Sequence, residues 1–179
     1  MSDDDTVWIR TAPAPDGSTY VVTLEIGQDI AVILDHDRAL AYAYEVLRAV
    51  VTAEYDAAVI AQLKDKGIPE ATAVEVVRIL RLDRPPPDDT ATAPLMIFPG
   101  VSRQTRKPFL RIDIDDKQAG EWTLEDARSN ALAVLEAHAI ADLDSAYYRA
   151  MTNLVQVPPE IGRTMVGELV NYKDQDTQP

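Results

Sequence analysis

The sequence predicts an α+β fold that contains two copies of a β-β-β-α-α unit, with antiparallel strands covered on one face by long helices. Two helical segments match each other: Arg38–Leu63 aligns with Asp126–Met151 at a shift of 88 residues, with about eight identical positions. The order of strand and helix patterns also occurs twice, which indicates an internal repeat. A stiff, polar, proline-rich stretch at residues 85–94 separates the two occurrences.

These observations predict a first repeat at residues 1–84, a linker at 85–94, a second repeat at 95–172 and a polar tail at 173–179. We expect a pseudo-twofold arrangement of the two repeats. They either form separate units or pack as one domain, and their strands form either one continuous sheet or two layers.

Each repeat begins with three short segments of strand-like sequence. In the middle segment of each, every second side chain is apolar, which is typical of a strand with one buried face. The apolar positions of that face are Val22, Leu24 and Ile26 in the first repeat and Leu110, Ile112 and Ile114 in the second. The outer strands are expected at Val7–Ile9 and Ile30–Leu34, and at Leu95–Phe98 and Glu121–Leu124.

A long helix and a shorter helix follow the strands in each repeat. The shorter helices are expected to begin at Pro69–Glu70 and Pro159–Glu160, because proline suits the first helical position. The long helices carry large apolar residues at helical spacing, and we expect this face to cover the sheet. Its members are Tyr44, Leu47, Val51, Tyr55, Ala58 and Leu63 in the first helix, and Leu132, Leu135, Ala139, Leu143, Ala146 and Met151 in the second.

Small residues recur every four positions on a second face of both long helices. We interpret this face as the place where the two helices cross, because small side chains let a neighbouring helix approach closely. The alternative is that alanine simply suits exposed helical positions. The predicted crossing residues are Ala49, Ala53 and Ala57 in the first helix and Ala137, Ala141 and Ser145 in the second.

The chain is acidic and contains no cysteine. Its 30 acidic and 17 basic side chains give a formal charge of −13, which disfavours direct binding to nucleic acids or anionic membranes. The lack of cysteine excludes a disulfide scaffold, Cys-ligated zinc and a thiol nucleophile. No apolar run approaches the ~20 residues of a membrane span, and the N-terminus lacks a signal-peptide pattern. These features predict a cytoplasmic protein, and the Ala- and Asp-rich composition favours a high-GC genome, such as that of an actinobacterium or one of its phages.

Asp35, His36 and Asp37 are the best local cluster for a metal or general-base site, because carboxylates and imidazole are common metal ligands. The cluster lies at a strand-to-helix junction, however, where aspartate is a usual N-cap. The matching junction at Thr123 has a capping pattern without histidine. Capping accounts for both junctions, so we favour it and predict no catalytic residue, no resident metal and no cofactor.

Acidic side chains recur at matching positions of the two long helices. We favour an acidic solvated face, and the alternative is a carboxylate cluster near the axis that binds a divalent cation. The residues are Glu45, Glu54, Asp56, Asp142 and Asp144. His138 lies one helical turn before Asp142, a spacing that could supply two metal ligands. We favour a surface pair of the two residues, or a histidine partly packed beside the sheet.

Basic residues concentrate in one loop of the second repeat, where the first repeat has none. They are Arg103, Arg106, Lys107 and Arg111. A repeated scaffold with one altered loop suggests a loop specialised for a partner, such as a phosphate or an acidic peptide. The alternative is a solvated hairpin loop that balances the acidic strands beside it.

Together these features predict a non-enzymatic interaction or assembly protein that binds a protein partner through a sheet face, a helix face or the basic loop. Phosphate-binding and nucleophile motifs are absent. Exposed strand edges also allow a homo-oligomer. One alternative is an acidic nucleic-acid mimic that occupies the basic groove of a DNA- or RNA-handling protein. A second alternative is a metal-assisted hydrolase at Asp35, His36 and Asp37.

Overall fold

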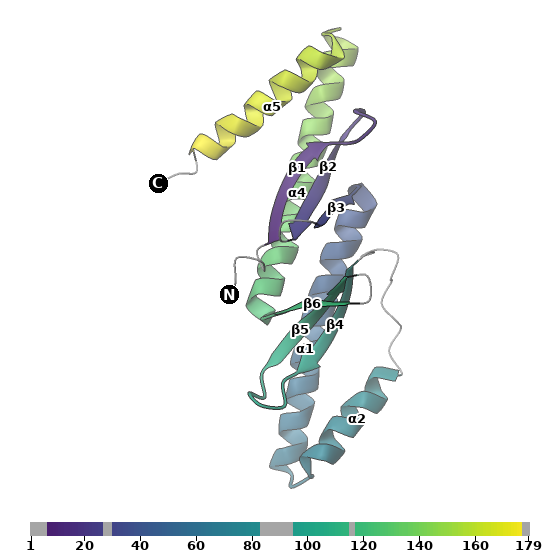
Figure 1. The fold of residues 1–179 in the computed structure, drawn as a ribbon, viewed down its shortest axis with the longest axis vertical. Helices are drawn as coiled ribbons and strands as arrows, with labels where there is room; N and C mark the ends of the chain where they lie inside the picture. The colour runs from purple at the N-terminus through teal and green to yellow at the C-terminus, as the bar shows by residue number, and fades with distance from the viewer. Residues whose placement is uncertain (1–6, 27–29, 83–94, 115–116, 177–179) are drawn as a thin grey trace.

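The computed structural model describes residues 7–26, 30–82, 95–114 and 117–176, which form an α+β fold (Figure 1). None of the described helices is both long and apolar enough to cross a membrane. The strands are β1 (Val7–Pro13), β2 (Tyr20–Ile26), β3 (Ile30–Leu34), β4 (Leu95–Val101), β5 (Pro108–Ile114) and β6 (Lys117–Trp122). The helices are α1 (His36–Asp65), α2 (Glu70–Leu82), α4 (Leu124–Arg149) and α5 (Pro159–Asp176), and a π-helical turn, η2, covers Ala150–Leu154.

The strands form two separate antiparallel sheets, with the orders β1-β2-β3 and β4-β5-β6. The predicted alternation is confirmed where the side chains are described, because Val22, Leu24, Leu110 and Ile112 are buried. The side chains of Ile26 and Ile114 lie outside the described residues. The last strand was predicted too late in the chain, at Glu121–Leu124, whereas β6 covers Lys117–Trp122. The strand ends at Trp122 because the next residue, a threonine, caps α4.

The helix starts follow the predicted capping chemistry. Asp35 accepts a hydrogen bond from the backbone N–H of Arg38 at 2.9 Å, which confirms it as the N-cap of α1. Thr123 accepts one from the backbone N–H of Asp126 at 3.1 Å and caps α4 in the same way. The shorter helices begin at Glu70 and Pro159, as the sequence predicts.

Each long helix packs mainly on the sheet of the other half of the chain. α1 follows β3 in sequence but lies against β4 and β5, whereas α4 follows β6 but lies against β1 and β2 (Figure 1). The two helices also pack side by side: Tyr42 of α1 donates a hydrogen bond to Asn130 of α4 at 2.9 Å. His36 meets His138 further along, so the two helices run antiparallel. One continuous core therefore contains residues from both sheets and both long helices.

The long helices bury a different face from the one predicted. Tyr44 and Tyr55 of α1 are 65% and 67% exposed, and Leu132 and Leu143 of α4 are 59% and 55% exposed. The buried face instead carries mostly small side chains, including Ala39, Ala43, Val46, Ala127, Ala131 and Val134. Each long helix has to approach a sheet and the other helix at once, and small residues allow that close packing. The prediction that the large apolar residues cover the sheet was therefore wrong for most of them. Leu47 and Leu135 of the predicted face do pack against the core that contains both sheets.

The predicted crossing residues fall into two groups. Ala49, Ala53, Ala137 and Ala141 are buried. The remaining two have other neighbours: Ala57 lines a cavity beside α2, and the Ser145 hydroxyl accepts a hydrogen bond from the backbone N–H of Tyr20 at 2.8 Å. A close contact between the long helices through the four buried alanines stays a prediction.

Candidate functional sites

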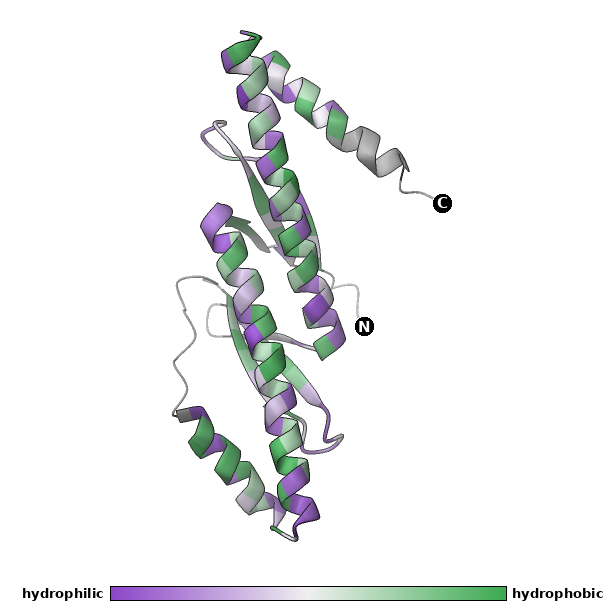
Figure 2. Ribbon diagram, turned by 180° about the vertical axis from the view of Figure 1, so that it is seen from behind, coloured by the Kyte–Doolittle hydropathy of each residue, from purple (hydrophilic) through white to green (hydrophobic). Residues whose placement is uncertain are grey.

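A row of large apolar side chains lies on the side of α1 and α4 that faces away from both sheets. Figure 2 shows the two long helices in front of the sheets, with their outer side uncovered by any sheet. We call this surface the outer helix face. It contains Leu40, Tyr44, Val51 and Tyr55 of α1, and Leu132, Leu143 and Tyr147 of α4, each between 41% and 67% exposed.

The size of the outer helix face is unusual for a surface that meets only water. If a fully exposed large side chain offers about 180 Å², its seven members expose on the order of 700 Å² of mainly apolar surface. Contiguous apolar patches beyond a few hundred Å² commonly mark interaction sites. Both helices contribute, and the aligned pairs Tyr44/Leu132 and Tyr55/Leu143 are exposed alike.

Both histidines of the chain meet at the contact between α1 and α4. His36 Nδ1 lies 2.9 Å from His138 Nε2 and 3.1 Å from Asp142 Oδ1. The ligand atoms of the three residues all lie within 4.8 Å of one another. Sequence analysis assigned His36 and the His138–Asp142 pair to separate clusters, so this meeting is a finding of the structure.

The other two members of the predicted Asp35–His36–Asp37 cluster have ordinary surroundings. The Asp35 carboxylate caps α1, and Asp37 is exposed in the first turn of that helix. Acidic residues in the first turn stabilise a helix through its dipole. The junction therefore supplies one candidate ligand, His36, to a site whose other members come from α4.

The five predicted acidic residues do not form one solvated face. Glu45, Asp56 and Asp144 are buried, the last two only 1% exposed. Glu54 and Asp142 remain exposed, and each carboxylate contacts a side chain of the other long helix. The ion-pair partners are Arg48 for Glu45, Arg81 for Asp56, Arg128 for Glu54 and His36 for Asp142.

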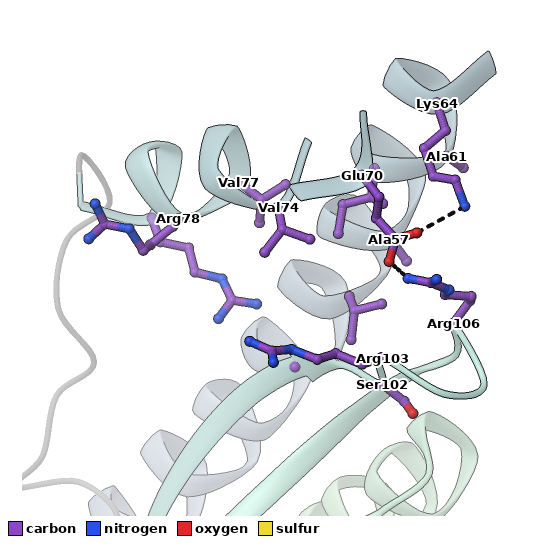
Figure 3. A pocket seen from close by; sticks show the side chains of 14 residues that line it. Ala57, Ala61, Lys64, Glu70, Val74, Val77, Arg78, Ser102, Arg103 and Arg106 are labelled. Atoms are coloured by element: carbon purple, nitrogen blue, oxygen red, sulfur yellow. Dashed lines mark ion pairs between the residues drawn. The ribbon is translucent and has the colours of Figure 1, made fainter. Parts of the chain in front are cut away.

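A cavity of about 340 Å³ opens between α1, α2 and the hairpin that joins β4 and β5 (Figure 3). Its volume lies at the lower end of the range of small-molecule sites. Part of its wall is apolar, and several cationic side chains surround the rest. The apolar part includes Ile60, Val74, Val77 and Val101, and the cations are Lys64, Arg78, Arg81, Arg103 and Arg106.

The cations of this cavity differ in how far they are neutralised. Glu70 forms ion pairs with both Lys64, at 3.4 Å, and Arg106 (Figure 3). Among the described residues Arg103 makes no ion pair, and its side chain extends into the space below α2 in Figure 3. Arg103 is therefore the cavity cation most open to an anionic ligand.

The structure divides the predicted basic loop. Arg103 and Arg106 line the cavity and Lys107 is exposed at the hairpin. Arg111 lies on β5, where it pairs with Asp113 at 3.0 Å and covers the Phe98 ring at 4.7 Å from the ring centre. Sequence analysis missed the cations of α1 and α2 in this cavity, because only the fold brings those helices to the loop.

Comparison with known protein families, curated protein sequences and solved structures finds no match for this chain. The three surfaces above differ in the chemistry that they can support. The outer helix face suits another apolar protein surface, the histidine cluster offers lone pairs suited to a metal ion, and the cavity suits a small organic anion.

Proposed function

We propose that the protein is a non-enzymatic assembly protein that pairs with a second copy of itself through the outer helix face. The observation that carries this proposal is the row of seven large apolar side chains exposed on α1 and α4. In such a pair the long helices of the two copies face each other, and the four sheets lie on the outside. Burying the row removes apolar surface from water, which is the main driving force of association.

Area and shape favour a second copy as the occupant. An exposed area on the order of 700 Å² is close to the ~800 Å² that each partner contributes to a standard interface. The face consists of two antiparallel helices, so a twofold axis through it brings equivalent surfaces together. Glu54 and Arg128 pair across the two helices at 2.5 Å, which neutralises their opposite charges on this exposed side.

A charge placed on the α1 part of the face should separate the two copies. We expect Val51→Glu to weaken the dimer at least ~100-fold, because an unpaired carboxylate in an apolar interface costs several kcal/mol. Sedimentation equilibrium over a range of protein concentrations measures this change. Ile79→Glu on α2 is the matched control, since Ile79 is 50% exposed and Val51 is 52% exposed. A monomeric wild type at about 100 μM, or equal dissociation constants for the two variants, contradicts the proposal.

We also propose that the two halves descend from one duplicated β-β-β-α-α unit and are related by a pseudo-twofold axis. Three observations support it: the matching helical sequences, the same element order in both halves, and the reciprocal packing of each long helix on the other half's sheet. A duplicated unit whose helix covers its partner's sheet resembles a dimer whose two chains have become joined.

The cavity supports a second candidate function, the binding of a small organic anion. Its apolar wall and Arg103, which forms no ion pair with any described residue, fit a molecule with a hydrocarbon body and one acidic group. We expect Arg103→Gln to weaken binding of the fluorescent probe anilinonaphthalene sulfonate about 10-fold, the effect of one lost charge-assisted hydrogen bond.

Lys107→Gln on the same hairpin is the control for this measurement and should leave the affinity unchanged. Fluorescence titration of the three proteins separates the outcomes. Equal affinities for all of them argue against the cavity as an anion site. Loss of binding in Val51→Glu, with Arg103→Gln unaffected, places the probe on the outer helix face instead.

A further inference from the structure

We propose that His36, His138 and Asp142 form a binding site for a divalent transition-metal ion such as Zn²⁺, with a further coordination position open to solvent. This inference is independent of the assembly proposed above. It stands on the convergence of the only two histidines in the chain with a carboxylate. Two imidazoles and one carboxylate are a donor set that zinc takes readily.

The fold holds these three groups in place from two directions. His36 is the first residue of α1, directly after the N-cap Asp35. His138 and Asp142 are one turn apart on α4, so both side chains project from the same side of that helix. The packing of α1 against α4 then sets the separation between the two helices' contributions.

The distances fit a bound ion with small adjustments. Ligand atoms that sit 2.0–2.1 Å from a tetrahedral zinc lie about 3.3 Å from one another. The contacts of His36 Nδ1 with His138 Nε2 and with Asp142 Oδ1 are 2.9 and 3.1 Å. An ion fits once these two contacts widen by a few tenths of an ångström and the third pair, His138 with Asp142, which lies within 4.8 Å, reaches a similar separation. Exposed side chains such as His36 and Asp142 can move that far without disturbing the core.

Hydrogen bonds alone do not satisfy the polar atoms of this cluster well. The Nδ1 atom of His36 carries either a proton or a lone pair. With a proton it points a single donor at two neighbours, and with a lone pair it faces the acceptor oxygens of Asp142. A metal ion accepts lone pairs from all three groups at once and removes this conflict.

The exposure of the three ligands and the net charge of the chain are consistent with a metal site that is open to solvent on one side. His138 is 9% exposed and is held by α4, whereas the side chains of His36 and Asp142 are 56% and 55% exposed. Three protein ligands with a solvent-facing side are the arrangement in which zinc retains a water molecule. The formal charge of −13 also favours the approach of a cation.

Calorimetric titration of the full chain with Zn²⁺ tests the site. We expect one ion per chain, and we expect His36→Ala and Asp142→Asn each to lower the affinity at least ~10-fold, since even second-shell changes at zinc sites cost that much. Both residues are exposed, so these substitutions should leave the fold intact. Glu136→Gln is the matched control, because Glu136 is an exposed carboxylate on the same helix.

Substituting Co²⁺ for Zn²⁺ provides a spectroscopic readout of the ligands. Wild type and Glu136→Gln should show the visible absorption of Co²⁺ in a low-symmetry nitrogen and oxygen site, and His36→Ala should lose it. The Val51→Glu variant should still bind Zn²⁺, because the site lies within one chain. An absence of Zn²⁺ binding to wild type, unchanged affinity in His36→Ala, or an equal loss in Glu136→Gln overturns the proposal.

Discussion

Produced as separate fragments, residues 1–89 and 90–179 should not form stable folded monomers, whereas mixing them should yield a folded one-to-one complex. The reason is the exchange of helices between the halves: α1 covers β4 and β5, and α4 covers β1 and β2. Fragment 1–89 lacks Leu95, Leu110 and Ile112, which share the core with the buried side of α1. Each such side chain contributes about 1.5–3 kcal/mol when buried, and a domain is stable by only ~5–15 kcal/mol in total.

Circular dichroism and analytical ultracentrifugation of each fragment and of the mixture measure this outcome. The control is the intact chain cleaved between residues 83 and 94 after folding, whose two pieces should stay together until they are denatured. A fragment that melts cooperatively as a monomer would show that each half has a sufficient core of its own.

Local patterns along the chain predict most of the strands and helix ends. The alternation around Leu24 and Leu110 identifies two central strands, because a strand exposes its two faces in turn. Asp35 and Thr123 mark the starts of the long helices, because their side chains satisfy free N–H groups of the first turn. These features depend on interactions over a few residues, which are readable from sequence.

The buried side of the long helices could not be predicted in the same way. An apolar stripe containing Tyr44 and Tyr55 indicates that something covers it, but it does not identify the partner. In this chain most of the stripe is exposed, and alanines such as Ala39 and Ala43 are buried in the core. The strongest apolar pattern in the sequence therefore belongs to an intermolecular surface under the proposed function.

The histidine cluster and the cavity depend on contacts between distant parts of the chain. His36 and His138 are 102 residues apart, and only the antiparallel packing of α1 and α4 joins them. Asp56 shows the same limit, since its charge predicts exposure while the packing of α2 over α1 buries it. Composition and spacing supply the candidate residues, and the tertiary fold determines which of them meet.

Replacing Arg81 with methionine should destabilise the protein by about 3 kcal/mol, because it removes a cation that pairs with a buried carboxylate. Asp56 of α1 is 1% exposed, and its Oδ2 lies 2.6 Å from an Nη atom of Arg81 on α2. For a chain of this size the loss corresponds to a fall in melting temperature of roughly 6–12 °C. Arg78→Met is a close control, since Arg78 lies one turn earlier and pairs with Glu75 at the surface, where the two side chains are 63% and 51% exposed. Exposed pairs contribute about 0–1 kcal/mol, so the control should change stability little.

The double variant Asp56→Val with Arg81→Met separates the loss of this ion pair from the cost of keeping the Asp56 carboxylate without Arg81. Removing both partners leaves an apolar contact between α1 and α2, so we expect the double variant to be more stable than Arg81→Met alone. Chemical denaturation of wild type, the single variants Asp56→Val and Arg81→Met, and the double variant gives the coupling energy. Equal destabilisation by Arg81→Met and Arg78→Met would mean that other neighbours of Asp56 carry its charge. A large coupling energy would instead identify this pair as the contact that fixes α2 on α1, and with it the wall of the cationic cavity.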